Sequence, residues 1–157
     1  MRPLYIFDLD GTLALIGHRL SILEDESDSY RWIKFYDACD KDLPNIPVIN
    51  TMERLKKSGA EILIFSGRSE EVREKTVDWL KIHTSFGDKD LDPSTGILTM
   101  RRVGDYTPDD VLKQSWIDNM LLEDLERLIA VFDDRSRVVN MWRNNGIACF
   151  QVADGEF

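Results

Sequence analysis

The sequence has little of what marks a secreted, membrane-spanning or redox protein. Its two cysteines, Cys39 and Cys149, are remote from each other and match no metal-binding or redox spacing. They are expected to be free thiols in a cytoplasmic protein, although distance along the chain does not exclude contact in space. No apolar run approaches the about 20 residues that span a membrane, and the N-terminal apolar stretch is too short for a signal peptide.

Positive charge is also scarce. The chain has 20 lysine and arginine residues against 29 aspartate and glutamate residues, which gives a formal net charge of −9. A broad nucleic-acid groove requires a basic surface, so this balance argues against one. It does not argue against a site for a single phosphate, because a few local arginines and a metal ion can bind one in an acidic protein.

What the chain does contain is an alternation of apolar runs and helix-like segments. Its 157 residues suit a single domain, 1–157. Strands are predicted at 4–8, 61–66, 97–102, 128–133 and 147–152, and helices at 46–57, 70–82, 108–120 and 136–144. Several runs are continuously apolar, which is typical of parallel strands covered on both faces. The pattern predicts an α/β fold with a mainly parallel five-stranded sheet, whose ligands bind at the carboxyl ends of the strands.

Segment 14–44 fits this pattern less clearly. Its acidic run at 24–28 is expected to be a solvated surface. Four aromatic residues follow near helical spacing, namely Tyr30, Trp32, Phe35 and Tyr36. We expect them to pack on the body of the protein, with stacking of a nucleobase on one of them as the alternative.

The most informative stretch is Asp-Leu-Asp-Gly-Thr at 8–12. Asp8 and Asp10 face the same side if the strand is extended, and Gly11 allows a sharp turn after them. Two adjacent carboxylates repel unless a cation lies between them, and Mg²⁺ prefers oxygen ligands. One carboxylate could then attack a substrate while the other moves protons. Taken alone, the motif also fits a strand end with two solvated acids.

Two further signals follow along the chain. Ser66, Gly67 and Arg68 lie between a strand and a helix, where a hydroxyl and backbone N–H groups can bind phosphate. The plainer interpretation is a residue that only starts the helix. Lys113 lies on a predicted helix, where most lysines are solvated, but a site of clustered carboxylates and phosphoryl oxygens requires a fixed cation.

The last signal is Asp133-Asp134 at the end of the fourth strand. Asp133 could complete a metal site, and Asp134 could orient a metal-bound water or a substrate arginine, while an acidic turn is the alternative. Each signal is weak by itself. Their joint order, at the ends of parallel strands that meet in one crevice, favours a single site.

In this order the motifs resemble those of the haloacid dehalogenase-like phosphatase superfamily, across nearly the whole chain. The resemblance implies a Rossmann-like three-layer sandwich. It also implies that Asp8 is the nucleophile that forms an aspartyl-phosphate, and that Asp10 is the general acid and then the base. Ser66 and Lys113 would hold the phosphoryl oxygens. Asp8, the backbone carbonyl of Asp10, and Asp133 would bind Mg²⁺.

A closer resemblance is to the phosphatase domain of bacteriophage-type polynucleotide kinase 3′-phosphatase. Residues 132–157 and Asp-Asp-Val-Leu-Lys at 109–113 carry it. It implies that Arg19, Arg68, Asp109 and Asp134 contribute to the site. The full set of expected phosphate- or substrate-binding residues is Thr12, Arg19, Ser66, Gly67, Arg68, Asp109, Lys113 and Asp134.

Two departures from that family matter. The sequence has no Gly-x-x-x-x-Gly-Lys-Ser/Thr motif, so a phosphatase module alone is expected, or half of a split system with a separate kinase or ligase partner. Segment 14–44 lies where superfamily members insert a cap, and its length suits only a small helical one. A modest cap leaves room for a bulky nucleic-acid 3′ end, and a small nucleotide could also enter.

Three functions are therefore compared. The first is a Mg²⁺-dependent phosphomonoesterase acting on a 3′-phosphate of nucleic acid or of a nucleotide. The second is a nucleotidase or small-metabolite phosphatase, which the acidic charge mildly favours. The third is a module that binds phosphorylated ends without chemistry, against which the intact set Asp8, Asp10, Lys113 and Asp133 argues.

Overall fold

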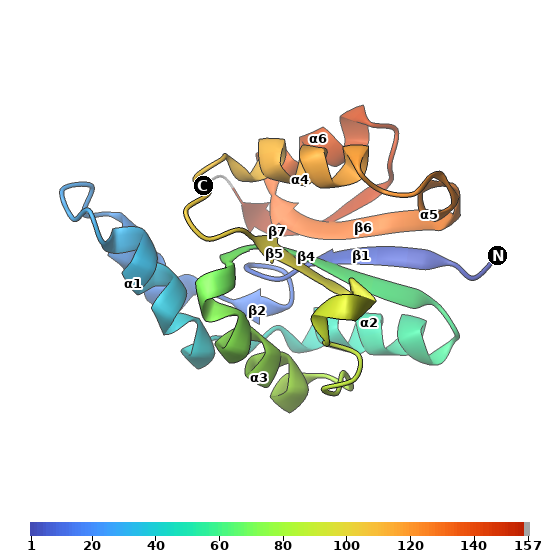
Figure 1. Cartoon of the computed structure of the whole chain (residues 1–157), viewed down its shortest axis with the longest axis horizontal. Coiled ribbons are helices and arrows are strands. Elements are labelled where there is room, and N and C mark those ends of the chain that lie inside the picture. Colours follow the sequence, from blue (N-terminus) through green and yellow to red (C-terminus); the bar gives the residue numbers. More distant parts are fainter. Residues whose placement is uncertain (156–157) are drawn as a thin grey trace.

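A parallel five-stranded sheet forms the centre of the protein in the computed structural model, which describes residues 1–155 (Figure 1). Its strands lie in the order β5-β4-β1-β6-β7, and every adjacent pair is parallel. The strands are β1 (Leu4–Asp8), β4 (Glu61–Ser69), β5 (Leu98–Arg101), β6 (Leu128–Arg135) and β7 (Cys149–Gly155). All five predicted strands are confirmed, and the sheet is the predicted α/β architecture.

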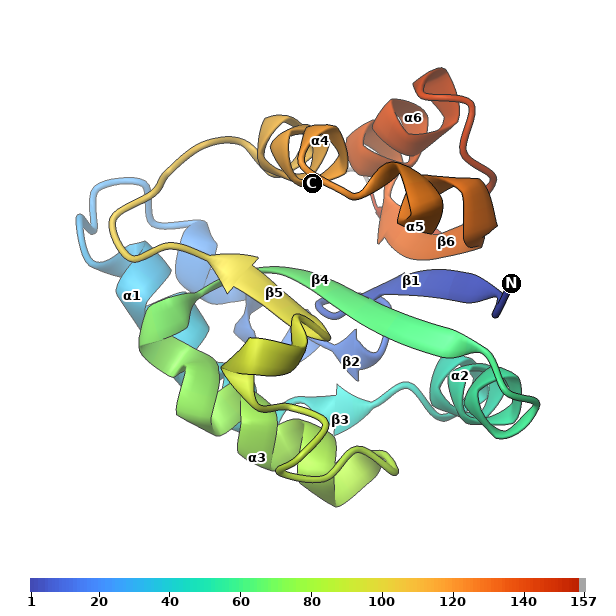
Figure 2. The ribbon, with the colours of Figure 1, turned by 45° about the vertical axis from the view of Figure 1, so that its right-hand side comes forward.

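Helices cover both faces of this sheet, which gives three layers (Figures 1 and 2). One face carries α2 (Ile46–Lys57) and α3 (Arg73–His83). A short 3₁₀ turn, η3 (Glu70–Val72), comes directly before α3. The other face carries α4 (Asp109–Asp118), α5 (Leu122–Arg127) and α6 (Ser136–Asn144). A further 3₁₀ turn, η4 (Pro93–Thr95), lies before β5.

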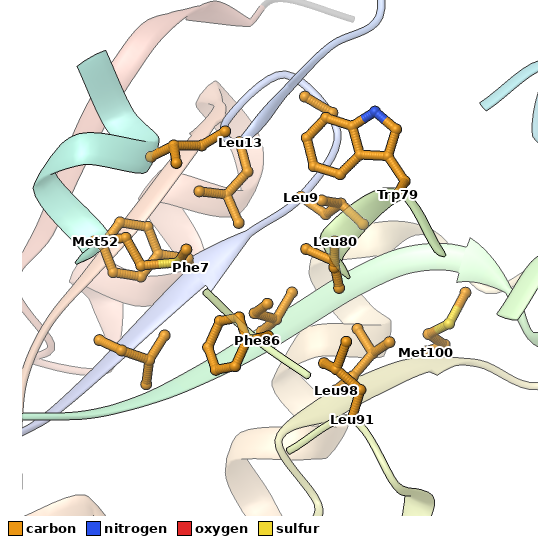
Figure 3. Close-up of a cluster of buried hydrophobic side chains, with 14 of the residues drawn as sticks. Phe7, Leu9, Leu13, Met52, Trp79, Leu80, Phe86, Leu91, Leu98 and Met100 are labelled. Atoms are coloured by element: carbon orange, nitrogen blue, oxygen red, sulfur yellow. The ribbon is translucent and has the colours of Figure 1, made fainter. Parts of the chain in front are cut away.

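Each face of the sheet has its own apolar core. Because successive strand residues point to opposite faces, Phe7 of β1 joins one core and its neighbour Ile6 joins the other. The first core includes Met52 of α2 and Trp79 of α3 (Figure 3). The second includes Trp142 of α6. Burial of these continuous apolar runs on both faces fixes β1 in the middle of the sheet and so fixes where its carboxyl end lies.

The element boundaries differ from the prediction in a few places. Helices 46–57 and 136–144 have the predicted bounds, whereas β4 continues three residues beyond 66 to Ser69. Helix α5 was not predicted, because its six residues are too few to show a helical apolar period.

Segment 14–44 is built on a small ribbon. Strands β2 (Ala14–Leu15) and β3 (Leu43–Pro44) pair antiparallel and bring the two ends of the segment together. Between them lie the 3₁₀ helix η1 (Gly17–Leu23), helix α1 (Arg31–Asp37) and the 3₁₀ helix η2 (Ala38–Lys41). Figure 1 shows α1 beyond the carboxyl end of β1, next to the first part of α3.

The aromatic residues of this segment divide into two groups. Phe35 is buried and Tyr36 is half-buried, as expected. Tyr30 and Trp32 are exposed, which corrects the expectation that all four pack on the body. In the acidic run, Glu24, Asp25 and Glu26 are exposed as expected and Asp28 is half-buried, but Glu24 and Glu26 also line the cavity described below.

The cysteines are free and belong to different cores, Cys39 to the first and Cys149 to the second. Among residues 1–155, no helix is both long and apolar enough to cross a membrane.

Candidate active site

The register of the central strands brings three predicted motifs to one edge of the sheet. Asp8 is the last residue of β1 and lies opposite Phe65 of β4, and its neighbour Phe7 lies opposite Phe132 of β6. The residues that follow Phe65 and Phe132 are Ser66 and Asp133. Parallel pairing thus collects residues from distant parts of the chain next to Asp8.

Gly11 makes the turn after β1 and also lets a second strand approach. Its φ of 83° lies in the left-handed region that favours glycine. A Cβ at this position would collide with the carboxylate of Asp134. Glycine is therefore required here both for the backbone conformation and for close contact between the β1 turn and the end of β6.

Asp8, Asp133 and Asp134 form an acidic cluster around Lys113. The Lys113 Nζ donates to Asp8 Oδ1 at 2.6 Å and to Asp133 Oδ2 at 2.8 Å. Thr12 donates from Oγ1 to Asp8 Oδ2 at 3.1 Å and makes a longer contact of 3.4 Å to Asp134 Oδ1. All five side chains are buried. Lys113 is thus the fixed cation that the sequence predicted, held between two of the carboxylates.

The charge of this cluster is not balanced. Burial raises the pKa of Asp8 well above its usual value, the charge of Asp133 raises it further, and Lys113 only partly counteracts them. Burial and Asp133 raise the pKa of Asp134 to about 6. For Lys113, the two neighbouring carboxylates outweigh burial and raise the pKa, so its ammonium stays charged. The cluster therefore has room for more positive charge.

The donor set fits a hard divalent cation. Asp8, Asp133 and Asp134 each offer a carboxylate oxygen, and these oxygens lie within 4.8 Å of one another. Oxygen-only donors with a surplus of negative charge suit Mg²⁺ or a similar ion. The sequence placed Asp134 beside the metal site rather than in it, and the geometry makes its carboxylate a third candidate ligand.

Asp10 belongs to a second ionic group, the arginine network of Asp10, Asp42, Arg19 and Arg68. Asp10 Oδ1 accepts from Arg19 Nη2 at 2.8 Å and from Arg68 Nε at 2.7 Å. Asp42 accepts from Arg19 Nε at 2.8 Å and Nη2 at 2.7 Å, and from Arg68 Nη2 at 2.8 Å. Its Oδ1 also lies 2.7 Å from His18 Nε2, so His18 contacts this network rather than serving only as a surface residue.

The arginine network has the opposite effect on its aspartate. Burial alone would raise the pKa of Asp10, but the charges of Arg68 and Arg19 outweigh burial and lower it. Both guanidinium groups are fully buried. Arg19 is further fixed over the Phe35 ring, 4.2 Å from the centroid, and Arg68 donates to Thr76 Oγ1 at 3.2 Å. The network holds the Asp10 carboxylate in one position.

Sequence reasoning missed Asp42 in the arginine network, as it missed Arg101 and Arg135, the two arginines that bind Asp109. Asp42 lies just before β3 with its side chain fully buried, and its backbone carbonyl accepts from Trp79 Nε1 at 2.8 Å. No local motif marks it. The available signal was indirect: two arginines expected at one site, Arg19 and Arg68, require a buried counter-ion, and segment 14–44 is rich in acidic residues.

The Ser66-Gly67-Arg68 stretch differs in detail from the expectation. The helix-capping residue is Ser69, whose hydroxyl accepts from Glu71 N at 3.3 Å, whereas Ser66 is buried inside the strand. Its Oγ accepts from Arg68 N at 3.2 Å. The proposed contact of Ser66 with phosphate remains a prediction.

Asp109 joins the site through two arginines. Its carboxylate accepts from Arg101 Nη2 and, at 2.8 Å, from Arg135 Nη1. Arg101 also donates to the Gly67 carbonyl at 2.8 Å. A Cβ on Gly67 would press against the Asp109 carboxylate, so the small residue is needed for this contact.

An open cavity of about 680 Å³ lies over these groups. Of the predicted residues, seven line it: Asp8, Asp10, Gly67, Asp109, Lys113, Asp133 and Asp134. Thr12, Arg19, Ser66 and Arg68 are fully buried behind them. The structure thus brings the whole predicted set together but places the two arginines on Asp10 and Asp42, so direct contact of these arginines with substrate stays a prediction.

The fold and the aspartate-rich site define a phosphatase of the haloacid dehalogenase type. The class C acid phosphatase from Bacillus anthracis has the same fold, with a TM-score of 0.63 at 11% identity over 99% of this chain and 68% of that one. Residues 2–157 match the family model described as the polynucleotide kinase PNKP phosphatase domain. The chain belongs to that family.

Two relatives are more similar in sequence. A candidate bifunctional polynucleotide kinase/RNA ligase of Autographa californica nuclear polyhedrosis virus is 31% identical over 141 residues, which is 87% of this chain and 17% of that protein. A chain in the solved structure of the Pnkp1/Rnl/Hen1 RNA repair complex is 30% identical, with a TM-score of 0.74 over 99% of this chain and 44% of that one. This chain thus spans less than half the length of either relative.

Proposed function

We propose that this chain is a Mg²⁺-dependent phosphomonoesterase that removes 3′-phosphates from nucleic-acid ends through an aspartyl-phosphate on Asp8. The observation that carries the proposal is the position of Asp8 on the cavity wall, with Lys113 on one carboxylate oxygen and Thr12 on the other. Asp10 lines the same cavity. A nucleophile and a proton carrier therefore face one space.

In the first step an Asp8 oxygen attacks phosphorus and the bond to the ester oxygen breaks. The leaving alkoxide takes a proton from Asp10. In the second step Asp10 takes a proton from water as the water oxygen attacks phosphorus, which releases inorganic phosphate and restores the Asp8 carboxylate. Splitting hydrolysis in this way replaces one difficult displacement with two easier ones.

Asp10 has a lowered pKa in the substrate-free protein, yet the first step requires its acid form. A phosphate dianion next to Asp10 would raise that pKa, because a nearby like charge disfavours the ionised carboxyl. The arginine network would then serve mainly to hold the carboxyl in place and to favour the anion needed in the second step.

Asp8 and Asp133, with the backbone carbonyl of Asp10 and the carboxylate of Asp134 as further ligands, would hold Mg²⁺. The bound ion would supply positive charge against the phosphoryl oxygens. Lys113 contributes to the same stabilisation with an ammonium that the carboxylates of Asp8 and Asp133 keep charged and fixed in position.

The 3′-nucleic-acid substrate is proposed from family membership, and the −9 charge of the chain leaves a nucleotidase as the second candidate. We also propose that a kinase or a ligase acts on the same ends, since the name of the viral relative joins kinase and ligase activities and the other relative is part of an RNA repair complex.

Phosphate release with Mg²⁺ tests these proposals. The substrates are a 3′-phosphorylated oligonucleotide, its 5′-phosphorylated isomer, and 3′- and 5′-mononucleotides. Fastest release from the 3′-phosphorylated oligonucleotide is expected. Preference for mononucleotides would instead establish the nucleotidase, and no release from any ester would eliminate both enzymes.

A further inference from the structure

The cavity over Asp8 has two chemically different walls. One wall comes from segment 14–44 and is apolar and aromatic: Ile16, Leu20, Leu23, Trp32, Phe35 and Tyr36. The other carries arginines from three separate elements: Arg101 of β5, Arg135 of β6 and Arg137 of α6. A ligand with one flat apolar end and one anionic end would complement both walls.

The aromatic wall is one face of α1. Trp32, Phe35 and Tyr36 have the i, i+3, i+4 spacing that places side chains on one side of a helix. The Trp32 ring lies 5.8 Å from Phe35 and 6.0 Å from Tyr36, between ring centroids. Tyr36 in turn donates from its hydroxyl to the Gly67 carbonyl at 3.3 Å, next to the site. Trp32 is therefore held in place while 37% of it stays exposed.

A second exposed aromatic residue lines the cavity from a different part of the chain. Tyr106 lies in the loop between β5 and α4 and is 77% exposed. It lines the same cavity as Trp32. Figure 2 shows this loop arching from β5 to α4 on the side where α1 lies. Large exposed aromatic residues at a cavity mouth are typical of surfaces on which bases stack.

The three arginines differ in how closely they pair with carboxylates of the protein itself. Arg101 and Arg135 both pair with Asp109. Arg137 lies 3.7 Å from Asp110, a long ion pair, and its side chain is 48% exposed. Arg137 is therefore the one of these three best suited to pair with a substrate anion.

Acidic residues beside the aromatic wall disfavour an anionic group there, and so set the orientation of a ligand in the cavity. Glu24 and Glu26 line the cavity next to the aromatic wall and are exposed. They repel phosphate, so a phosphate beyond the reacting one is disfavoured beside them and favoured near the arginines.

Resting on the proposed function, we propose that this cavity binds the terminal nucleoside of a 3′-phosphorylated strand, with its base against Trp32 and the adjoining phosphodiester at Arg137. Recognition then requires at least a dinucleotide. Because stacking does not involve the 2′-hydroxyl, ribose and deoxyribose ends are both accepted.

The test compares kcat/KM for three 3′-phosphorylated compounds: a dinucleotide, a mononucleotide, and a dinucleotide analogue whose terminal base is missing. p-Nitrophenyl phosphate reports phosphatase activity separately. The wild-type protein should prefer the dinucleotide to both other compounds. Base stacking is typically worth about 1–3 kcal/mol per base, so Trp32→Ala should lower kcat/KM for the dinucleotide about tenfold, mainly through KM. The same substitution should leave the abasic analogue unchanged, and Trp32→Phe should retain most of the activity.

Arg137→Gln should lower kcat/KM for the dinucleotide but not for the mononucleotide, and should make the rate less dependent on salt. Matched controls are Tyr30→Ala, an exposed aromatic of the same segment outside the cavity, and Arg54→Gln on α2. Neither control should change any rate.

An equal effect of Trp32→Ala on the dinucleotide and the abasic analogue, or no effect on either, would overturn the base site. If Arg137→Gln changed kcat/KM by the same factor for the dinucleotide and the mononucleotide, or did not change it at all, the phosphodiester contact would be overturned. Failure of the wild-type protein to hydrolyse any of the esters would instead refute the proposed function. Ribose and deoxyribose forms of the dinucleotide are run in parallel and should give similar kcat/KM values, and a strong preference for one form would overturn the acceptance of both.

Discussion

Asp8 and Asp10 lie two residues apart but belong to ionic groups with opposite charge balance. In the acidic cluster, three carboxylates surround the single ammonium of Lys113, and the pKa values of Asp8 and Asp134 are raised. In the arginine network, two guanidinium groups face the two carboxylates of Asp10 and Asp42, and the pKa of Asp10 is lowered.

The two ionic groups differ in whether their charges are balanced by the protein's own side chains. The arginine network is electrically complete and therefore serves to hold Asp10 in place. The acidic cluster has more carboxylates than cations, so a bound cation would reduce the repulsion among its carboxylates. Asp8 and Asp10 look equivalent in the sequence motif, but their pKa values shift in opposite directions because their neighbours differ.

The largest effect is expected from Asp8→Asn. The amide cannot act as the nucleophile, so phosphate release from p-nitrophenyl phosphate should fall by about 10³-fold or more. Since the change removes one of three crowded carboxylates, thermal stability in chelator should not fall. Asp118→Asn, on the exposed side of α4, is the matched control and should leave the rate unchanged. An Asp8→Asn variant with normal turnover would rule out the covalent route.

Asp42→Asn should break the arginine network. It leaves two buried guanidinium groups with one carboxylate, and removal of one partner from a buried ion pair typically costs about 3–5 kcal/mol. Urea unfolding measures this loss. The control is Asp28→Asn, which breaks the exposed pair with Lys34 and should change the free energy of unfolding far less, because exposed ion pairs contribute little. If both variants lost the same small free energy of unfolding, the arginine network would not be a structural unit.

Mg²⁺ should stabilise the acidic cluster and not the arginine network. A ligand at a hundredfold excess over its dissociation constant stabilises the folded state by about 2.7 kcal/mol, so the thermal midpoint should rise with Mg²⁺ and fall again with chelator. Asp133→Asn should abolish the response, and Asp118→Asn should retain it. A response that survives in the Asp133→Asn variant would place the ion elsewhere.

The smallest effect is expected from Thr12→Val. The hydroxyl that donates to Asp8 is lost, while volume is nearly kept, so unfolding free energy should fall by about 1 kcal/mol with a modest loss of rate. Thr12→Ser keeps the donor and should restore the rate. Comparable rates in the valine and serine variants would show that the hydroxyl has no part in positioning Asp8.

The sheet and the acidic cluster could be predicted from sequence because their signals are local. Continuous apolar runs mark parallel strands, and Asp8, Asp133 and Lys113 lie in recognisable motifs. The turn after β1 also requires glycine at one position, Gly11, for reasons that the local motif already suggests.

The arginine network could be predicted only in part. Arg19 and Arg68 were expected at the site, but the buried carboxylate between them, Asp42, has no motif and is one of many acids in its segment. Helix α5 was missed because it is short, and the exposure of Trp32 could not be predicted because periodicity gives the spacing of a helix but not what lies opposite it.

The ribbon of β2 and β3 has a consequence for how substrate range can change. Its pairing joins both ends of the segment at one point, with Asn45 donating to the Leu13 and Thr12 carbonyls. The residues between them form one insert that could be exchanged as a unit, provided that the packing of the buried Phe35 and Cys39 is kept. Arg19 and Asp42 lie inside the exchangeable part and complete the setting of Asp10. A graft from a relative would therefore alter specificity and keep turnover only if it brought an arginine and an aspartate to these same two places.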